Sequence, residues 1–350
     1  MANRARELKA IGAARELFTA RSGQLAGIAL VNLACFCWAT NIVLGRSLRF
    51  DVGPLTLAAL RFVVGSALLT ALLQREAPEQ RRLGSDWPLL LLMGIAGVAL
   101  FAPLQYLGLR YTTAANAALL QALAPLITGL LGGLLIRETM SRYQVIGALV
   151  GLLGVLVLIS GGSLTFWRTM DSSIGDLIIL VAVTLWALYT VISRRVTTQR
   201  PVLSATGLST LLGVPFLLLA MIWEWQTRPL HLTPGLVLAI LYVGISPTVI
   251  GFLSWNGGVR RLGPSGAMVF YNTLPLYGAL LAFLFLGEEI GWAHLAGGAL
   301  VIGGGIWAAR AQSRAARAQS RAARTQSQAT GAESQAVHSQ SPATGETSSE

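Results

Sequence analysis

The chain has 350 residues, of which 54% are hydrophobic and 12% charged, and its formal net charge is +11. Soluble domains carry about 25% charged residues, so this composition leaves too little polar surface for a soluble protein and indicates a polytopic helical membrane protein. The basic residues stand between apolar runs and in the two tails rather than on one folded face, which argues against nucleic-acid binding.

Ten apolar runs follow one another along the chain, and each can cross about 30 Å of hydrocarbon as a helix rising 1.5 Å per residue. Lengths near twenty residues favour helices over membrane strands, which need about ten. The predicted spans are 23–45, 54–73, 87–109, 112–135, 141–160, 174–192, 202–223, 233–256, 265–286 and 291–309. Residues 1–22 are predicted to be a cytoplasmic segment, either amphipathic on the membrane surface or frayed. Residues 310–350 lack an apolar stripe and are expected to be a disordered basic and polar tail.

The distribution of arginine and lysine predicts the orientation of these spans. With the N-terminus inside, the inner segments hold twenty basic residues and the outer segments five, and Arg61 lies within a span. The predicted protein therefore has both termini in the cytoplasm. Five spans in each half make the second half enter the membrane from the opposite side, so the two halves are expected to be inverted repeats.

A weak internal repeat supports this division of the chain. Residues 108 to 147 recur without gaps 150 positions later, which pairs the following residues: Gly108 with Gly258, Arg110 with Arg260, Ala117 with Ala267, Pro125 with Pro275, Glu138 with Glu288 and Gly147 with Gly297. The predicted units are a first repeat over 23–161, a connecting loop over 162–173 and a second repeat over 174–309.

Aromatic and polar residues deep in the spans are candidates for a substrate pocket. Trp38 and Asn41 share one helix face, and Trp186 and Tyr189 repeat this spacing in the second half. Gln121 and Tyr271 occupy equivalent places in the fourth and ninth spans. The predicted substrate-binding residues are Trp38, Asn41, Tyr106, Gln121, Trp186, Tyr189, Tyr271 and Asn272. The alternatives are that the aromatic residues mark the membrane interface and that the amides bond neighbouring helices.

Three further features of the spans have a functional and a structural interpretation. Arg61 either receives a substrate carboxylate or has a structural role. Pro125 and Pro275 are either hinges or sources of static curvature. Glu138 is expected to cap a helix or pair with an arginine rather than to take part in transport chemistry, and the same holds for Glu288.

At this point the residues resemble the EamA family of the drug/metabolite transporter superfamily, over about residues 23 to 309. The resemblance rests on the two five-span halves, a tryptophan in the first and sixth spans, Arg61-Phe62, Arg137-Glu138, Gly287-Glu288 and the glycine-rich fifth and tenth spans. It implies a transporter that exports amino acids and other small metabolites across the bacterial inner membrane.

The charges within the spans narrow the expected substrate. No Asp or Glu lies in the middle of any run, which disfavours a pump of lipophilic cations and favours neutral or zwitterionic solutes. The alternatives are an exporter of apolar drugs, nucleosides or sugar derivatives, and a lipid scramblase. The sequence holds no HExxH and no nucleophile–base pattern, so no enzymatic activity, metal or cofactor is expected. The expected partners are a small-molecule substrate and membrane lipids; a monomer suffices and a dimer is compatible.

Overall fold

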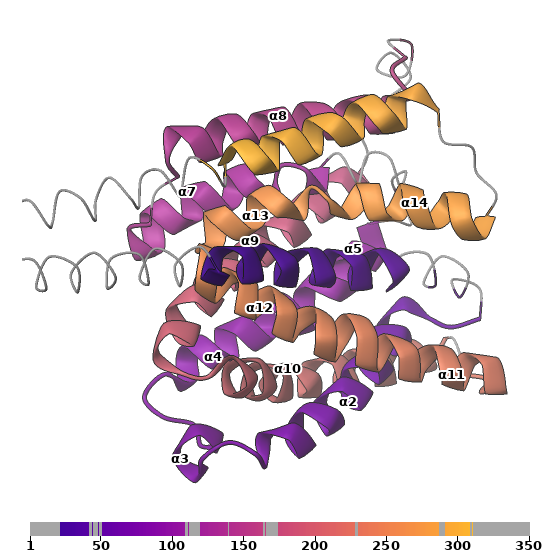
Figure 1. Cartoon of the computed structure of the whole chain (residues 1–350). Helices are drawn as coiled ribbons and strands as arrows, with labels where there is room; N and C mark the ends of the chain where they lie inside the picture. The colour runs from indigo at the N-terminus through magenta and orange to yellow at the C-terminus, as the bar shows by residue number, and fades with distance from the viewer. Residues whose placement is uncertain are drawn as a thin grey trace, which may run out of the picture.

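The computed structural model of the chain describes residues 22–41, 44, 48, 51–108, 111, 120–138, 140–163, 165, 174–227, 230–286, 291–308 and 310. Every regular element in these residues is helical. The long helices run across the molecule in roughly one direction and pack side by side (Figure 1).

The described helices of the first half include long helices and one span that a π-helix interrupts. They are the helix Ser22–Asn41, α2 (Pro54–Leu73), α3 (Pro78–Arg81), α4 (Trp87–Met93), the π-helix η1 (Gly94–Leu100), α5 (Phe101–Gly108), α7 (Ala124–Ile136) and α8 (Arg142–Ser160).

The second half shows a similar order of elements, although no described element in it corresponds to α3. Its helices are α9 (Ile174–Gln199), α10 (Val202–Trp225), α11 (Pro234–Val243), the π-helix η3 (Gly244–Ile250), α12 (Gly251–Leu262), α13 (Pro264–Tyr271), α14 (Leu274–Leu286) and the helix Trp292–Ala308.

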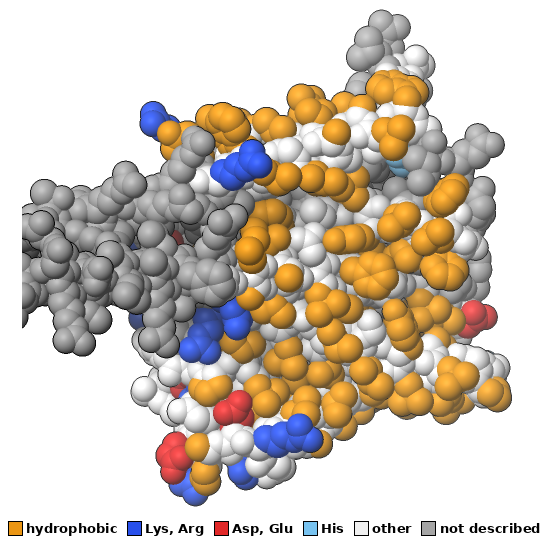
Figure 2. All heavy atoms as spheres, viewed as in Figure 1, with side chains coloured by type: hydrophobic (Ala, Val, Ile, Leu, Met, Phe, Trp, Pro, Cys, Tyr) orange, Lys and Arg blue, Asp and Glu red, His pale blue; other side chains and the backbone are white. Residues whose placement is uncertain are grey.

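The predicted helical membrane class is confirmed. In the described part of the chain seven helices are long and apolar enough to cross a membrane, and three shorter apolar helices comprise α7, most of α8 and Trp292–Ala308. Their outer surfaces are apolar: Leu134, Leu219 and Phe285 are 71%, 67% and 73% exposed. Apolar side chains cover most of the face in Figure 2, while basic side chains gather toward one end of the helices. Such a surface is stable in lipid and not in water.

The internal repeat is visible in local structure as well as in sequence. The π-helix η1 begins at Gly94 and η3 begins at Gly244, 150 positions later. A π-helix is rare in proteins, so the presence of two of them 150 positions apart supports the internal repeat. Turns at residues 122–123 and 272–273 are likewise separated by 150 positions.

Both prolines of the predicted hinges follow these turns directly. Pro125 lies in the first turn of α7, and Pro275 is the second residue of α14. Proline has no N–H to continue a preceding helix, but it fits the first turn of a new one. The two residues therefore start fresh helical segments after a break rather than kinking a continuous helix, and their role as hinges stays a prediction.

Glycines let α8 and the helix Trp292–Ala308 cross closely. A Cβ on Gly147 would lie 2.7 Å from the carbonyl oxygen of Gly304, and a Cβ on Gly154 would lie 2.6 Å from that of Gly297. The two contacts are reciprocal, because Gly297 and Gly304 are the repeat equivalents of Gly147 and Gly154. The two helices lie side by side in Figure 1, as expected for small residues at a membrane helix interface.

Candidate functional site

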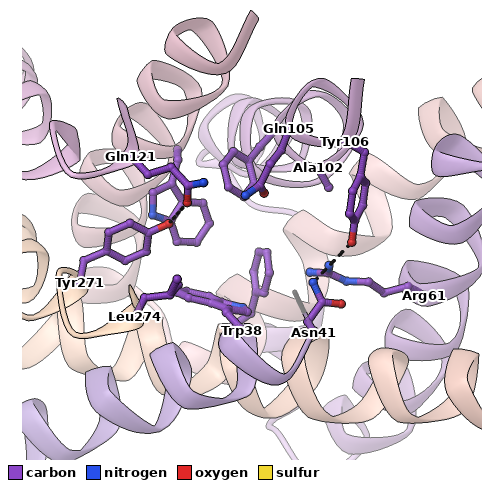
Figure 3. A pocket seen from close by; sticks show the side chains of 12 residues that line it. Trp38, Asn41, Arg61, Ala102, Gln105, Tyr106, Gln121, Tyr271 and Leu274 are labelled. Atoms are coloured by element: carbon purple, nitrogen blue, oxygen red, sulfur yellow. Dashed lines mark hydrogen bonds between the residues drawn. The ribbon is translucent and has the colours of Figure 1, made fainter. Parts of the chain in front are cut away.

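A cavity lies between helices of both halves. The cavity itself is small, about 30 Å³, and the space free of atoms rises to about 450 Å³ only when the open solvent at its mouth is counted. The lining side chains point inward from the surrounding helices (Figure 3). They are Trp38, Asn41, Arg61, Phe101, Ala102, Gln105, Tyr106, Gln121, Trp186, Phe252, Tyr271 and Leu274.

Aromatic rings from both halves form the closed wall of this cavity. The ring centroids of Trp38 and Trp186 are 5.0 Å apart, in an edge-to-face arrangement. Trp186 also lies 5.0 Å from Phe101, and Trp38 lies 6.1 Å from Phe252. These are favourable aromatic separations. The predicted convergence of Trp38 and Trp186 is therefore present in the structure.

A hydrogen bond joins two repeat-equivalent residues across the cavity. The hydroxyl of Tyr271 donates to Oε1 of Gln121 at 3.3 Å, and the dashed line in Figure 3 marks this contact. The contact therefore lies at a place in the cavity where the two halves of the chain meet.

Arg61 brings a positive charge to the opposite side of the cavity. The residue is 6% exposed. Its Nε donates to Oγ1 of Thr248 at 2.8 Å, and the Thr248 hydroxyl donates to the carbonyl of Val243 at 2.7 Å. Nearby, Nδ2 of Asn41 donates to the hydroxyl of Tyr106 at 3.4 Å. Arg61 on α2 is thus fixed by η3 of the other half.

Trp38 is held by η3 in a similar way. Its Nε1 donates to the carbonyl of Pro247 at 3.0 Å. The equivalent Nε1 of Trp186 has no hydrogen-bond partner among the described residues, although Trp186 lines the cavity. The two tryptophans therefore differ: one is anchored and one keeps a free donor beside the cavity.

Two of the predicted binding residues do not line the cavity. Tyr189 stacks behind Trp186 with ring centroids 5.1 Å apart, and its hydroxyl accepts a hydrogen bond of 2.7 Å from Asn256. Asn272 is buried beside Gly151, and neither polar atom of its amide has a partner among the described residues. Tyr189 shares α9 with Trp186 but points to another side of that helix, and Asn272 lies in the turn that follows α13, directly after the lining residue Tyr271.

Five lining residues and one supporting residue were not among the predicted candidates. Phe101, Ala102 and Gln105 lie on α5, Phe252 is the second residue of α12, and Leu274 begins α14. Thr248 lies within η3 and holds Arg61. Phe101 and Phe252 stand at nearly equivalent repeat positions, which is a signal that the sequence offered.

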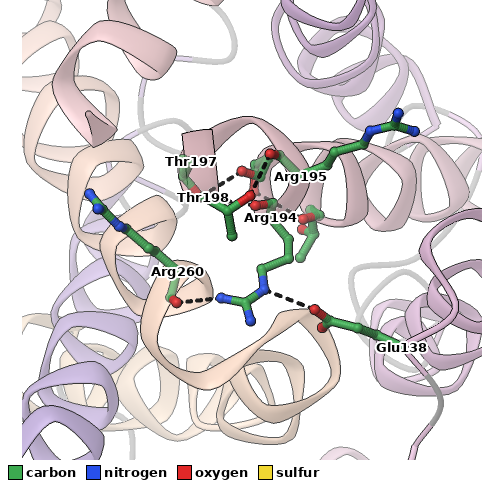
Figure 4. Close-up of polar contacts among 8 residues, drawn as sticks. Glu138, Arg194, Arg195, Thr197, Thr198 and Arg260 are labelled. Carbon is green, nitrogen blue, oxygen red and sulfur yellow. Dashed lines mark hydrogen bonds and ion pairs between the residues drawn. The ribbon is translucent and has the colours of Figure 1, made fainter. Parts of the chain in front are cut away.

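A second group of polar contacts joins the halves at one end of the helices (Figure 4). Nε of Arg194 at the end of α9 pairs with Oε1 of Glu138 at 3.0 Å, which confirms the predicted ion pair of Glu138. Nη1 of Arg194 donates to the carbonyl of Arg260 at 2.5 Å. Glu138 and Arg194 also line an open hollow with Arg195 and neighbouring residues. Glu288 lies outside the described residues.

Metal chemistry has no support in the described part of the chain, where no group of three or more His, Cys, Asp or Glu residues could hold a metal ion. The site described above consists of aromatic rings, amides, hydroxyls and one guanidinium. It offers neutral acceptors and cationic donors, which are the kinds of polar group found in small-molecule sites.

Most of the chain is similar in sequence to known proteins. The profile of the EamA-like transporter family matches residues 25–160 and 173–309. The chain is 31% identical to the uncharacterized transporter YyaM of Bacillus subtilis (strain 168) over 281 residues, which cover 79% of this chain and 90% of that protein. It is 28% identical to a protein of Streptantibioticus cattleyicolor named "Probable terminal-alkyne amino-acid exporter", over 78% of this chain and 89% of that protein. A solved crystal structure of a protein with 26% sequence identity superposes with a TM-score of 0.66 and covers 82% of this chain and 97% of that one.

Proposed function

Because the chain belongs to the EamA-like transporter family, we propose that it is a secondary transporter of the bacterial inner membrane that exports small neutral or zwitterionic metabolites such as amino acids. The observation that carries the proposal is the cavity between the two halves, with aromatic walls and a few polar groups. Such a lining suits a small amphiphilic solute. The name of the Streptantibioticus relative supports amino acids as the first class to test.

The proposed topology has ten crossings in two inverted repeats, over 23–161 and 174–309, with both termini in the cytoplasm. The excess of basic residues in the inner segments supports this orientation. The similar order of elements in the two halves supports the repeat. Binding sites at the interface of two repeats are common in secondary transporters, and a single chain then provides a complete pathway.

Alternating access between the two sides is the proposed mechanism. In the proposed orientation the ends of α7, α9 and α12 face the cytoplasm, and the contacts of Arg194 with Glu138 and Arg260 tie them together. Asn41, Arg61 and Tyr106 lie nearer the outer ends of their helices. The conformation described here would then be closed on the inside, and transport would require these inner contacts to break while the breaks at Pro125 and Pro275 bend.

Counterflow in proteoliposomes tests the proposal. Vesicles loaded with unlabelled phenylalanine, uridine or an apolar drug are diluted into a trace of the labelled solute, with and without a pH gradient. Saturable accumulation of phenylalanine is expected for the loaded vesicles and not for empty ones. Accumulation of the nucleoside or drug alone would move the substrate to that class, and lipid scrambling without solute counterflow would overturn the carrier proposal.

A further inference from the structure

We infer that Arg61 recognises a carboxylate group of the transported solute and thereby restricts the cavity to solutes that carry one. The inference rests on the proposed carrier function, because it names the substrate class of the same cavity. The first observation that supports it is the positive charge of Arg61.

A positive charge inside a membrane protein is expensive unless it is paired. Arg61 is 6% exposed, so most of its hydration is lost. The ion pairs in the described part of the chain are Arg194 with Glu138 and Arg200 with Asp86, and Arg61 belongs to neither. The lining of the cavity contains no Asp or Glu among the residues that the structure describes. The charge of Arg61 is therefore available to an anionic group that enters the cavity.

The guanidinium is oriented for such a group. A guanidinium has five N–H donors in a fixed plane, and one of them, on Nε, is used by the hydroxyl of Thr248 at 2.8 Å. This bond anchors the inner edge of the plane. In Figure 3 the side chain of Arg61 extends from α2 toward Asn41 and Tyr106 at the cavity. The side chain of Tyr106 also hydrogen-bonds the guanidinium, and the remaining N–H groups at the cavity are the ones that a carboxylate could bind.

The remainder of the cavity suits the rest of an amino acid. The rings of Trp38 and Trp186 offer an apolar wall and can attract an ammonium group through their faces. The oxygens of Gln121 and Tyr271 are neutral acceptors within the same cavity. These groups are uncharged, so they cannot replace the ion pair that a solute carboxylate would form with Arg61. A solute that keeps its amine but lacks its carboxylate should therefore be rejected.

A purely structural role for Arg61 makes a different prediction. The bond between Arg61 and Thr248 ties α2 to η3, and a structural arginine would affect all solutes equally when it is replaced. A recognition residue changes the preference between solutes. The decisive quantity is the ratio of affinities for matched solutes with and without the carboxylate.

The experiment measures binding and counterflow of four matched solutes: phenylalanine, 3-phenylpropanoate, phenethylamine and phenylalaninamide. Binding to purified protein in detergent is followed by thermal stabilisation, since a ligand of the folded state raises the melting temperature. Wild-type protein is expected to bind the two carboxylates and to bind the two amines about 10- to 100-fold more weakly, the range for loss of a charged hydrogen-bonded contact. Arg61→Gln should lose this preference, and Arg61→Lys should keep part of it.

Arg142→Gln serves as the matched control, because it removes an exposed arginine that stacks on Tyr143 outside the cavity. A folded Arg61→Gln protein that prefers carboxylates as wild type does would overturn the inference, and so would wild-type protein that binds phenethylamine as tightly as phenylalanine. In both cases counterflow continues and the carrier function stands. Absence of binding and counterflow for all four solutes with folded wild-type protein would instead overturn the proposed amino-acid carrier, and this inference with it.

Discussion

The hydrogen bond between Gln121 and Tyr271 allows a direct test of whether the cavity is the binding site. Tyr271→Phe removes the hydroxyl while keeping the ring of a residue that is 5% exposed. The bond is long, at 3.3 Å, and half-buried Gln121 can regain a partner from water in the cavity. Its loss should therefore cost about 0.5–1.5 kcal/mol, the usual net value of one hydrogen bond.

This free energy corresponds to a roughly 2- to 12-fold weaker Kd for phenylalanine if the pair shapes the bound state. Gln121→Leu should weaken binding to a similar extent, because it removes the same bond from the other side. The double variant should be no weaker than the worse single variant, since either change already breaks the bond. The coupling energy from this double-mutant cycle is the quantity that matters.

Tyr277→Phe is the matched control. The hydroxyl of Tyr277 donates to Oδ1 of Asn32 at 3.0 Å, and neither residue lines the cavity. This variant should leave the Kd for phenylalanine unchanged. Strict additivity of the two cavity changes, or an equal effect of Tyr277→Phe, would refute the reasoning that the contact between equivalent residues organises the binding site.

Three further predictions concern stability in detergent, measured by thermal unfolding. Glu224→Ala should destabilise by about 1–3 kcal/mol, because the carboxylate of this buried residue accepts from the free backbone N–H groups of Leu55 and Thr56 at 3.3 and 2.7 Å; an unchanged melting temperature would contradict this. Gly147→Leu should destabilise the crossing with the last helix, whereas Gly278→Ala, where no atom lies within 4 Å of the added Cβ, should not. The guanidinium of Arg200 holds the pKa of Asp86 below its usual range through hydrogen bonds of 2.8 and 2.7 Å. Because the pKa of Asp86 is lower in the folded state, its contribution to stability is fully present above the ordinary pKa of about 3.9 and is lost as pH falls through the lower folded value. In Asp86→Asn the melting temperature should therefore fall less at acid pH than in the wild type. An identical pH profile for both proteins would count against the pair.

The parts of the fold set by hydropathy could be predicted from the sequence. Apolar runs of sufficient length become helices in lipid, because the backbone must satisfy its own hydrogen bonds there. The repeat could also be predicted, since equivalents such as Trp38 and Trp186 lie at nearly constant spacing. The pairing of Glu138 followed from its place at a span end beside inner arginines, and it is present in the structure.

The direction of individual side chains was harder to predict. Tyr189 shares a helix face with Trp186 by spacing, but its hydroxyl is bound by Asn256 away from the cavity. Helical spacing assigns a face to within about one residue, and α9, of which about half is buried, packs against neighbours on more than one face. No pattern in the sequence distinguishes a side chain that faces the cavity from one that packs against a neighbouring helix.

The two π-helices could not be predicted from local sequence. In η3 the hydroxyl of Thr248 bonds the carbonyl of Val243, five residues earlier, and Trp38 from the other half bonds the carbonyl of Pro247. The bond from Trp38 is a tertiary contact, and it competes with the ordinary helical ladder only once the halves have met. Phe101 and Phe252, which follow the π-helices, were missed for the same reason.

The crossing of α8 with the last helix also has a consequence for biogenesis. Gly147 contacts Gly304, which is synthesised 157 residues later. At about 5–20 residues per second of translation, α8 resides in the bilayer for roughly 10–30 s before its partner has been made. During that interval its glycine face must be covered by lipid or by a chaperone of the insertion machinery, and a ribosome that stalls within the second half would leave this face open to degradation.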